Sequence, residues 1–475
     1  MLYSWGNVPG VVIAGLRGGS GKTIISLGIT VAWRTRQFKV APFKKGPDYI
    51  DAGWLSKAAG HPCYNLDTYL CDKDVVLSSY LKHTRNFDIA VVEGNRGLYD
   101  GIDIDGTTST AELAKLLNLP ILLVMDCTKS TRTMAALLMG CMKFDADTNI
   151  CGVILNRVAG KRHEKKIRSN IKRFCDIPVF GALPKLAAED FPERHMGLVT
   201  LEEHAFSGKA LEDAKHSAAK YIDLDGLYAA IMGIHGKKNE AAAKKASEIG
   251  SHTYEISVDQ EKVTIGVVRD SAFQFYYPDN IEAIEKLGAE IVFISPLTQK
   301  TIPDVDAIYM GGGFPETHAA QLADNYVFKK QLKGLSKKGL PIYAECGGFI
   351  FLGESIELNG QVYPMSGILP VRFGLSKKPQ GHGYTEVEVA HENPFYQCGE
   401  RLRGHEFRYS RITSIDYMDQ NMAFRMERGK GIIDKKDGFF KNNTFGTYTH
   451  LHALGSPSWA PALVNKAKSF KASKS

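Results

Sequence analysis

A glycine-rich stretch near the N-terminus constrains the fold of this chain more than any other segment. Residues 15–23 read Gly-Leu-Arg-Gly-Gly-Ser-Gly-Lys-Thr. An apolar run at 11–14 precedes them and predicts a buried strand, and an apolar run at 24–33 follows and predicts a helix packed against a sheet. Such a turn exposes successive backbone N–H groups at the N-terminus of the helix, where a polyphosphate binds favourably. The segment therefore predicts a phosphate-binding loop.

Two side chains complete this predicted phosphate site. Lys22 is placed to reach the β- and γ-phosphates of a nucleotide, and the hydroxyl of Thr23 is placed to bind Mg²⁺. The common phosphate loop has four residues between its first glycine and the Gly-Lys pair, whereas five separate Gly15 from Gly21 here. A chance glycine-rich turn is the alternative, but the flanking strand and helix favour the phosphate site.

Length and composition limit the remaining classes of protein. A chain of 475 residues predicts two or three domains. The net charge of +7 is mild, compatible with ordinary solubility or with an acidic small-molecule substrate, and the absence of an arginine-rich arm argues against nucleic acid. None of the eight cysteines forms a C-x-x-C pair, so no zinc site is predicted. Without a signal-like segment or a run of eighteen apolar residues, we expect a cytoplasmic protein that does not bind membranes.

The first half of the chain alternates between predicted strands and helices. This pattern predicts a parallel sheet covered by helices on both faces. The expected strands are 39–43, 88–92, 120–126, 150–155 and 179–183, and helices are expected at 110–117 and 133–142.

Charged residues follow several of these strands, at the edge where open α/β sheets bind ligands. The segment Lys44–Asp51 carries two lysines and two carboxylates after a strand, and it is either part of a site or a solvated loop. Glu93 ends an apolar strand, as the Mg²⁺-binding carboxylate of nucleotide-binding domains does. The loop that follows it, 95–101, adds further charged and amide side chains.

A second α/β unit follows a polar segment rich in alanine and lysine. We expect an N-terminal domain at 1–235, a linker at 236–262, a second domain at 263–455 and a basic tail at 456–475 that frays. Strands of the second domain are expected at 263–268, 290–294, 307–310, 340–344 and 445–448, with a helix at 280–287.

Cys346 stands between an expected strand and an apolar helix, in the arrangement of a nucleophile elbow. The helix N-terminus favours the thiolate, and Gly347 lets a substrate carbonyl approach backbone N–H groups. Gly312 and Gly313 follow the preceding strand and are candidates for a second oxyanion donor. A buried core cysteine is the alternative interpretation of Cys346.

The nucleophile needs a base, and two histidines follow the last expected strand. By spacing alone either His450 or His452 could serve, and half of a metal site is the alternative. The polar stretches 381–386 and 403–410 either line a site or form surface loops.

These motifs, taken in order, resemble the cobyrinic acid a,c-diamide synthase family over nearly the whole chain. The resemblance implies an α/β fold with an N-terminal P-loop domain similar to dethiobiotin synthetase, which has the same five-residue spacer, and a C-terminal class I glutamine amidotransferase domain. The motifs lie at 15–23, 43–51, 93–101, 192–195, 275–280, 311–316, 344–348, 403–410 and 448–452.

The resemblance also implies a reaction. Glutamine is hydrolysed in the second domain, and the ammonia passes to the first, where ATP phosphorylates a side-chain carboxylate of an acidic tetrapyrrole. Ammonia then displaces the phosphate and leaves a carboxamide, at the a and then the c acetate group, in cobalamin biosynthesis. A homodimer is a further expectation.

Roles carried over by position complete the predicted sites. Cys346 is the expected nucleophile and His450 its base, with Gly312, Gly313 and Gly347 at the oxyanion. Many class I glutaminases carry a glutamate where this chain has His452, so the third member of the triad is left open. ATP is expected at Gly15, Gly18, Gly19, Ser20, Gly21, Lys22, Thr23 and Asn156, Mg²⁺ at Thr23, Asp48 and Glu93, and the substrate at Lys45, Asp51, Arg96, Tyr99 and Asp100.

Other interpretations remain open at this point. Arg17 lies where partition and septum-placement ATPases keep a lysine, which favours a nucleotide-switched dimer, but Cys346 and its glycine-rich turns argue against that class. Cobyric acid synthase has the same domain order, and the His-Leu-His ending favours the a,c-diamide branch. The macrocycle is undetermined among cobyrinic acid, hydrogenobyrinic acid, nickel sirohydrochlorin and sirohaem.

Overall fold

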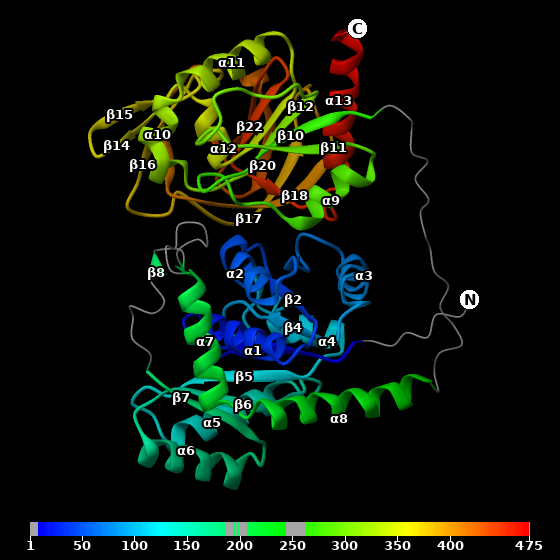
Figure 1. The fold of residues 1–475 in the computed structure, drawn as a ribbon, viewed down its shortest axis with the longest axis vertical. Coiled ribbons are helices and arrows are strands. Elements are labelled where there is room, and N and C mark those ends of the chain that lie inside the picture. The colour runs from blue at the N-terminus through cyan, green and yellow to red at the C-terminus, as the bar shows by residue number, and fades with distance from the viewer. Residues whose placement is uncertain (1–7, 186–192, 195–196, 199–206, 244–261, 475) are drawn as a thin grey trace. The chain divides into compact units, whose positions relative to one another are not determined.

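The computed structural model describes residues 8–185, 193–194, 197–198, 207–243 and 262–474. The chain divides into two compact units, Met1–Thr253 and Tyr254–Ser475. Each unit is built on its own large sheet (Figure 1). In the described part of the chain, no helix has the length and apolar character needed to cross a membrane.

The first unit contains a seven-stranded sheet in the order β3-β2-β4-β1-β5-β6-β7, and every neighbouring pair is parallel. The predicted parallel α/β class is therefore confirmed. The strands are β1 (Gly10–Gly15), β2 (Val40–Lys45), β3 (Tyr64–Leu66), β4 (Ile89–Glu93), β5 (Ile121–Asp126), β6 (Ile150–Val158) and β7 (Val179–Pro184), with a separate pair β8 (Glu193–Arg194) and β9 (Gly197–Leu198). The helices are α1 (Lys22–Thr35), α2 (Tyr49–Ala59), α3 (Lys73–Thr84), α4 (Thr110–Leu117), α5 (Arg132–Phe144), α6 (Lys161–Phe174), α7 (Ser207–Tyr221) and α8 (Leu224–Ala243).

Helices α1, α7 and α8 share one apolar core with the centre of this sheet. All six residues of β1 are buried, as expected for a strand covered on both faces. Gly28 of α1 allows the close approach of α7, because a Cβ there would lie 2.6 Å from the carbonyl oxygen of Ala214. Since all strands are parallel, the loops after β1, β2, β4, β5 and β6 meet at one edge, where the predicted phosphate loop also begins.

The second unit contains a ten-stranded sheet in the order β11-β10-β12-β13-β22-β21-β20-β17-β18-β23 and a smaller sheet in the order β15-β14-β16-β19. The large sheet is parallel from β11 to β22 and antiparallel beyond. The strands are β10 (Thr264–Val268), β11 (Glu290–Ile294), β12 (Ala307–Met310), β13 (Ile342–Glu345), β14 (Ser355–Leu358), β15 (Gln361–Pro364), β16 (Val371–Leu375), β17 (Gly381–Val389), β18 (Arg401–Arg408), β19 (Ser410–Ile415), β20 (Met422–Arg428), β21 (Lys436–Lys441), β22 (Thr444–Thr447) and β23 (His450–Leu451). The helices are α9 (Pro278–Lys286), α10 (Ala319–Asp324), α11 (Tyr326–Lys337), α12 (Gly347–Leu352) and α13 (Trp459–Lys474), with short 3₁₀ turns η1 (Pro315–His318) and η2 (Asp419–Asn421).

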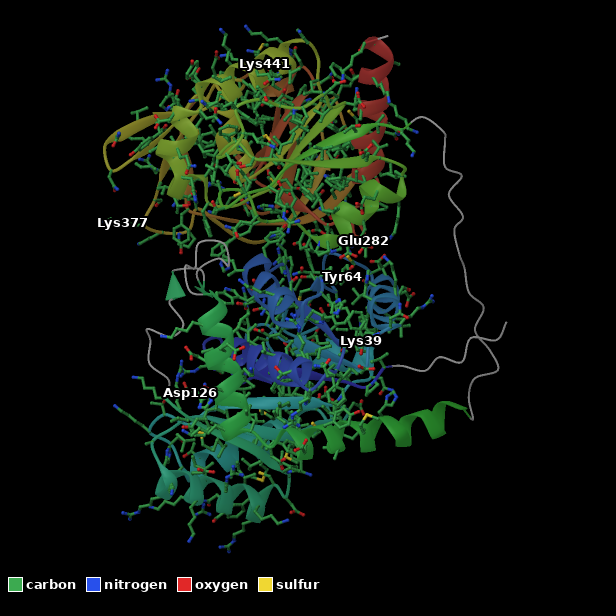
Figure 2. The ribbon with its side chains drawn as sticks, viewed as in Figure 1. Lys39, Tyr64, Asp126, Glu282, Lys377 and Lys441 are labelled. Atoms are coloured by element: carbon green, nitrogen blue, oxygen red, sulfur yellow. The ribbon has the colours of Figure 1, made fainter. Side chains whose placement is uncertain are left out.

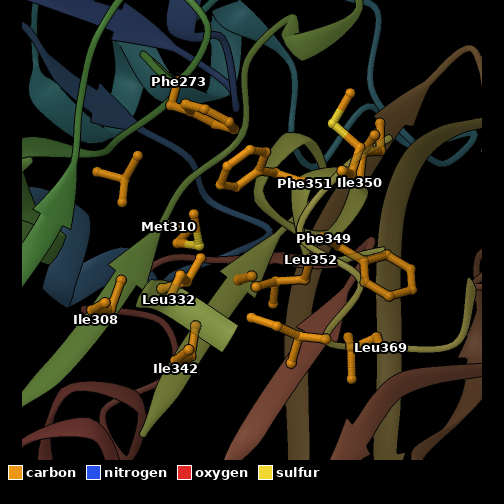
Figure 3. Packing of buried hydrophobic residues seen from close by; sticks show 14 of the residues in the cluster. Phe273, Ile308, Met310, Leu332, Ile342, Phe349, Ile350, Phe351, Leu352 and Leu369 are labelled. Atoms are coloured by element: carbon orange, nitrogen blue, oxygen red, sulfur yellow. The ribbon is translucent and has the colours of Figure 1, made fainter. Parts of the chain in front are cut away.

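Strand β13 lies between two apolar cores and presents alternate residues to each. Ala344 belongs to the core around α12, which also contains Ile342, Phe349 and Leu352 (Figure 3). Tyr343 belongs to the core on the other face, which contains Trp459 of α13. This alternation decides on which side of the sheet each residue at the end of β13 lies.

The structure contradicts one expectation about the second half of the chain and adds to others. The tail expected to fray begins with Ser456, which is buried, and continues as helix α13, which buries Trp459 and Leu463. The stretches 381–386 and 403–410 are not surface loops, because they lie mainly in the paired strands β17 and β18. Helix α8 extends to Ala243, into the expected linker, of which residues 244–261 lie outside the described part. Residues 192 and 195 of the motif at 192–195 also lie outside it.

Candidate functional sites

The predicted phosphate loop forms the turn between β1 and α1. Gly21 is the N-cap of α1 and has a φ of 93°, a left-handed conformation that favours glycine. Cβ atoms on Gly18 and Gly19 would meet nothing within 4 Å, so this part of the loop leaves room for a ligand. The Lys22 ammonium donates to the carbonyl oxygens of Arg17, at 3.2 Å, and Arg96, at 2.8 Å. Lys22 therefore joins the phosphate loop to the loop after β4.

Behind the phosphate loop, one buried lysine lies among three carboxylates. The Lys44 Nζ is 2.8 Å from Asp51 Oδ2 and 3.0 Å from Glu93 Oε1. Asp48 Oδ2 lies 3.8 Å from the same ammonium. Thr23 adds a hydroxyl to this carboxylate cluster, donating to Glu93 Oε1 at 2.7 Å. The structure thus brings together the predicted residues Thr23, Asp48, Asp51 and Glu93.

Burial and the neighbouring charges both shift the pKa values of the residues in and beside this cluster. Burial, helped by the neighbouring Asp51, raises the pKa of Asp48 to about 7, and burial also raises the pKa of Glu93. Burial opposes the ionised form of Asp51 as well, but attraction to Lys44 outweighs it and lowers the pKa of Asp51. Burial and repulsion from Lys44 lower the pKa of Lys22 to about 8. Anionic phosphates beside Lys22 would restore its charge.

The donor set of this cluster suits Mg²⁺. Thr23, Asp48 and Glu93 offer hydroxyl and carboxylate oxygens, the ligands that this hard cation prefers. Glu93 Oε2 is buried without a hydrogen-bond partner, so it is available to a cation. Within the described residues no group of three or more histidine, cysteine, aspartate or glutamate side chains forms a complete metal cage. That agrees with Mg²⁺ sites built from few protein ligands together with phosphates and water.

The lysine in the carboxylate cluster is Lys44, to which the sequence alone assigned no role, whereas the substrate contact of Lys45 stays a prediction. Neighbouring residues of a strand point to opposite faces, so only one of the two can reach the cluster. Lys45 is buried as well, and burial lowers its pKa, although Asp67 partly opposes this effect. The parity of β2 relative to Glu93 in the paired strand β4 was the signal available in the sequence: Lys44 is the residue in register with Glu93.

Residues near the carboxyl ends of β5 and β6 contact the phosphate loop from the other side. Asn156 donates from Nδ2 to the Ser20 carbonyl oxygen at 2.9 Å, and a Cβ on Gly21 would collide with that amide. Asp126, labelled in Figure 2, ends β5 and binds Arg17 at 3.1 Å and Arg157 at 2.7 Å. The predicted adenine contact of Asn156 stays a prediction, and its described contact is with the loop.

The remaining predicted substrate residues follow β4. Arg96 is exposed and has a φ of 51°, which is uncommon for a residue other than glycine. Asp100 accepts from the Gly97 N–H at 2.9 Å, and the Tyr99 hydroxyl donates to the carbonyl oxygen of Cys141 at 2.6 Å.

In the second unit, Cys346 forms a sharp turn between β13 and α12. Its φ of 46° and ψ of −96° are strained for a residue with a side chain, and strain of this kind is found at nucleophile elbows. The Cys346 N–H donates to the Thr447 carbonyl oxygen at 2.8 Å, which fixes the turn to β22. A Cβ on Gly348 would lie 2.6 Å from the carbonyl oxygen of Met310, so only glycine fits there.

The predicted oxyanion glycines surround this turn. A Cβ on Gly347 would lie 2.9 Å from the backbone nitrogen of Gly313, so these two residues are in close contact. A Cβ on Gly312 would lie 2.6 Å from Cε1 of His450. The structure therefore places Gly312, Gly313, Gly347 and His450 around Cys346.

His450 is the histidine whose side chain is hydrogen-bonded to Cys346. Its Nδ1 lies 3.3 Å from Glu345 Oε2, and its ring stacks on that of His405 with centroids 4.9 Å apart. Burial lowers the pKa of His450, but the hydrogen bonds to Cys346 and Glu345 outweigh it and raise the pKa to about 10. His452 contacts a different acid, with Nε2 3.4 Å from Asp279 Oδ2.

Sequence reasoning missed Glu345 and His405. Glu345 directly precedes Cys346, and its charge in a strand of otherwise apolar residues was the available signal. His405 is the cross-strand partner of His450 in the β18–β23 pair, which only the fold shows. A metal half-site, the alternative for the two histidines, is not favoured, because each ring contacts a different acid: His450 contacts Glu345 and His452 contacts Asp279.

Comparison with known proteins agrees with both sites. Residues 9–192 match the model of an AAA domain, and residues 264–458 match that of a CobB/CobQ-like glutamine amidotransferase domain. These matches, with the two sheets, confirm the predicted P-loop and amidotransferase domains and make ATP and glutamine substrates of the chain.

Relatives of one name match the chain along almost all of its length. Cobyrinate a,c-diamide synthase of Magnetococcus marinus is 39% identical over 461 residues, covering 96% of this chain and 97% of the relative. The protein of the same name from Archaeoglobus fulgidus is 37% identical over 468 residues, covering 98% and 99%. That from Listeria monocytogenes is 37% identical over 445 residues, covering 93% and 96%. The chain therefore belongs to the cobyrinate a,c-diamide synthase family of glutamine-hydrolysing amidating enzymes.

Proposed function

We propose that this enzyme converts the a and c acetate carboxylates of cobyrinic acid into carboxamides, in cobalamin biosynthesis, using ATP and glutamine. The observation that carries the proposal is the presence on one chain of a strained cysteine hydrogen-bonded to a histidine and a phosphate loop backed by carboxylates. The names of the relatives support the substrate. We assign synthesis to residues 1–235 and glutamine hydrolysis to residues 263–455.

Ammonia comes from glutamine at the Cys346 turn. Cys346 attacks the carboxamide carbon of glutamine, and the backbone N–H groups near Gly313 and Gly347 bind the developing oxyanion. His450 gives the leaving ammonia its proton and then takes a proton from the water that hydrolyses the thioester. Glutamate leaves, and the thiol is restored.

The carboxylate acceptor is activated at the phosphate loop. Its oxygen attacks the γ-phosphorus of ATP, so an acyl phosphate forms and ADP leaves. Lys22 and the loop N–H groups bind the phosphates and offset the charge that develops on them. Ammonia then attacks the acyl carbon, phosphate leaves, and the nitrogen loses a proton to give the amide.

Thr23, Asp48 and Glu93 are the residues we assign to Mg²⁺. A bound Mg²⁺ would neutralise part of the charge of the phosphates. Asn156 is assigned to the adenine, in addition to its contact with Ser20.

An acidic macrocycle needs cationic groups that offset the desolvation of its carboxylates, and we assign this role to Arg96 and Lys45. We assign Asp51, Tyr99 and Asp100 to the same substrate pocket. Arginine suits it because its planar fork binds a carboxylate at two points. Arg96→Ala should cost about 1.5–3 kcal/mol, or roughly one to two decades in kcat/KM for the macrocycle, with ATP binding nearly unchanged. A variant that matches the parent on every accepted macrocycle removes Arg96 from the site.

The decisive experiment is a substrate panel. The parent enzyme is incubated with ATP, glutamine and one macrocycle at a time: cobyrinic acid, hydrogenobyrinic acid, nickel sirohydrochlorin or sirohaem. The masses of the products are measured by mass spectrometry. We expect two successive amidations of cobyrinic acid. Amidation of another macrocycle in preference corrects the substrate, and amidation of none contradicts the proposed substrate class.

A further inference from the structure

A base histidine in a catalytic triad needs an acid at its second ring nitrogen. The acid fixes the tautomer, so that one nitrogen carries a proton while the other faces the nucleophile, and it stabilises the imidazolium that forms. In this chain the position two residues after His450 holds His452, which cannot take that role. His452 is instead paired with Asp279.

The acid that contacts His450 comes from a different element. Glu345 is the last residue of β13, and its side chain is 1% exposed. Its Oε2 lies 3.3 Å from His450 Nδ1 and accepts from the Tyr309 hydroxyl at 3.2 Å. Its Oε1 accepts from the Leu451 N–H at 3.2 Å. Three contacts thus hold the carboxylate toward the second ring nitrogen of His450.

Strand geometry explains how Glu345, the residue before the nucleophile Cys346, reaches His450. Along β13, Tyr343 and Glu345 share one face, and Tyr343 lies in the core that contains Tyr309 and Trp459. The chain then turns sharply at Cys346, which brings the thiol within hydrogen-bonding distance of the His450 side chain.

We propose that Glu345 is the third member of the glutaminase triad, a positioning residue that acts on Cys346 through His450. The proposal rests on the proposed hydrolysis of glutamine at Cys346. Glu345 accepts a hydrogen bond from the Nδ1 proton of His450, so the imidazolium holds the proton taken from the Cys346 thiol while the thiolate attacks the glutamine carbonyl. The S–C bond forms, the C–N bond breaks, and the same proton leaves with ammonia.

The surroundings leave this role to Glu345. His405, from β18, stacks on His450, but burial and the two other histidines hold its pKa well below the usual range, so it stays neutral. Tyr277 contacts the rings of both His405 and His452, and Tyr309 from β12 contacts Glu345 itself. Asp279, from α9, contacts His452. Glu345 is therefore the negatively charged group at Nδ1 of His450.

The pair Asp279–His452 offers a matched control for the pair Glu345–His450. Both are buried contacts between an acid and a histidine, at 3.4 and 3.3 Å, and each acid can be changed to its amide without change of shape. The test compares Glu345→Gln with Asp279→Asn in the full-length enzyme. The first readout is the kcat of glutaminase between pH 6 and 10.

The second readout does not need turnover. Iodoacetamide alkylates thiolates, and mass spectrometry separates the Cys346 peptide from that of the exposed Cys398, which serves as an internal reference. Without the Glu345 carboxylate the His450 imidazolium is less stable, so it supports the Cys346 thiolate less well. The pH of half-maximal alkylation at Cys346 should therefore rise, while that at Cys398 stays constant.

We expect Glu345→Gln to lower kcat by roughly 10²–10⁴-fold, as loss of a triad acid does, and to shift the Cys346 alkylation profile to higher pH. Asp279→Asn should leave kcat within a factor of about three of the parent value and should leave the pH of half-maximal Cys346 alkylation unchanged. Glu345→Asp, which keeps the charge on a shorter side chain, should give an intermediate kcat and a smaller shift.

Three outcomes overturn the proposal. They are a Glu345→Gln or Glu345→Asp enzyme equal to the parent in both readouts, an Asp279→Asn enzyme that shows the same losses, and a fall in kcat with an unshifted alkylation profile. A parent enzyme without glutaminase activity contradicts the proposed function instead. In that case the alkylation profiles of the variants still decide whether Glu345 acts through His450.

Discussion

The pKa of Lys22 depends both on the burial of its side chain and on the charge of a bound ligand. Burial and repulsion from Lys44 lower the pKa of Lys22 to about 8, so the side chain is largely neutral at pH 9. A bound triphosphate supplies negative charge beside it and raises that pKa again. Nucleotide binding should therefore be linked to the uptake of a proton at alkaline pH.

The linkage can be measured by titration calorimetry of ATP in two buffers with different ionisation enthalpies. At pH 9 we expect the uptake of nearly one proton by the parent, and at pH 6.5 none that depends on Lys22, which is already charged there. Lys22→Arg is the matched control, because arginine stays protonated throughout. Equal proton uptake by the parent and Lys22→Arg at pH 9 would contradict the assignment.

At the scale of elements, the loop after β12 sets the position of the catalytic histidine. The backbone of Gly312 passes so close to the His450 ring that a Cβ would lie 2.6 Å from Cε1. Gly312→Ala should therefore displace His450 and lower glutaminase activity more than tenfold, since a small displacement of a catalytic group lowers the reaction rate by a large factor.

The control for this change lies in the same unit. A Cβ on Gly334, in α11, would meet no atom within 4 Å, so Gly334→Ala should leave glutaminase activity intact. Normal activity of Gly312→Ala would show that the histidine is not held by this contact.

Helix α13 is a second element with a measurable role. Trp459 is 1% exposed and packs edge-on against Tyr309 and Tyr343 at centroid distances of 5.0 and 6.0 Å. Trp459→Ala should lower the free energy of unfolding by about 3–5 kcal/mol, as measured by denaturant titration of the full-length protein. A loss below about 1 kcal/mol would mean that the helix is peripheral to the core.

These elements also show what the sequence could predict. The bounds of strands such as β1 and β4 and of helices such as α4 are predicted closely. Their apolar residues follow one another in a clear pattern, and the residues that end these elements stand next to them in the sequence. Helix α13 was misjudged because its lysines suggested a solvated tail, whereas its apolar residues complete a core built by distant strands. Lys44 and Glu345 were missed for a related reason: strand parity and pairing place them, and a motif scan weighs neither.

At the scale of the whole molecule, the proposed function places glutamine hydrolysis and ATP-dependent amidation on one chain, linked by ammonia. Cys346→Ser should abolish amidation with glutamine, but ammonium salts should still support it, because the phosphate loop lies in the other unit. Lys22→Ala should lose amidation with either nitrogen source. The assay follows product mass with glutamine and with ammonium chloride in parallel. A folded Cys346→Ser enzyme that makes no product from ammonium would refute this division of labour.

The buried ammonium of Lys44 gives the enzyme a resident counterion. Before a nucleotide arrives, it already neutralises part of the charge of Asp48, Asp51 and Glu93, so the cluster does not depend on dissolved cations to stay folded. A free divalent ion approaching it meets a like charge, whereas an ion carried by a triphosphate arrives with its own negative partner. On the proposed metal assignment, the two enter together. The enzyme then takes up its magnesium as the magnesium–nucleotide complex, and the free ion alone does not fill the cluster first.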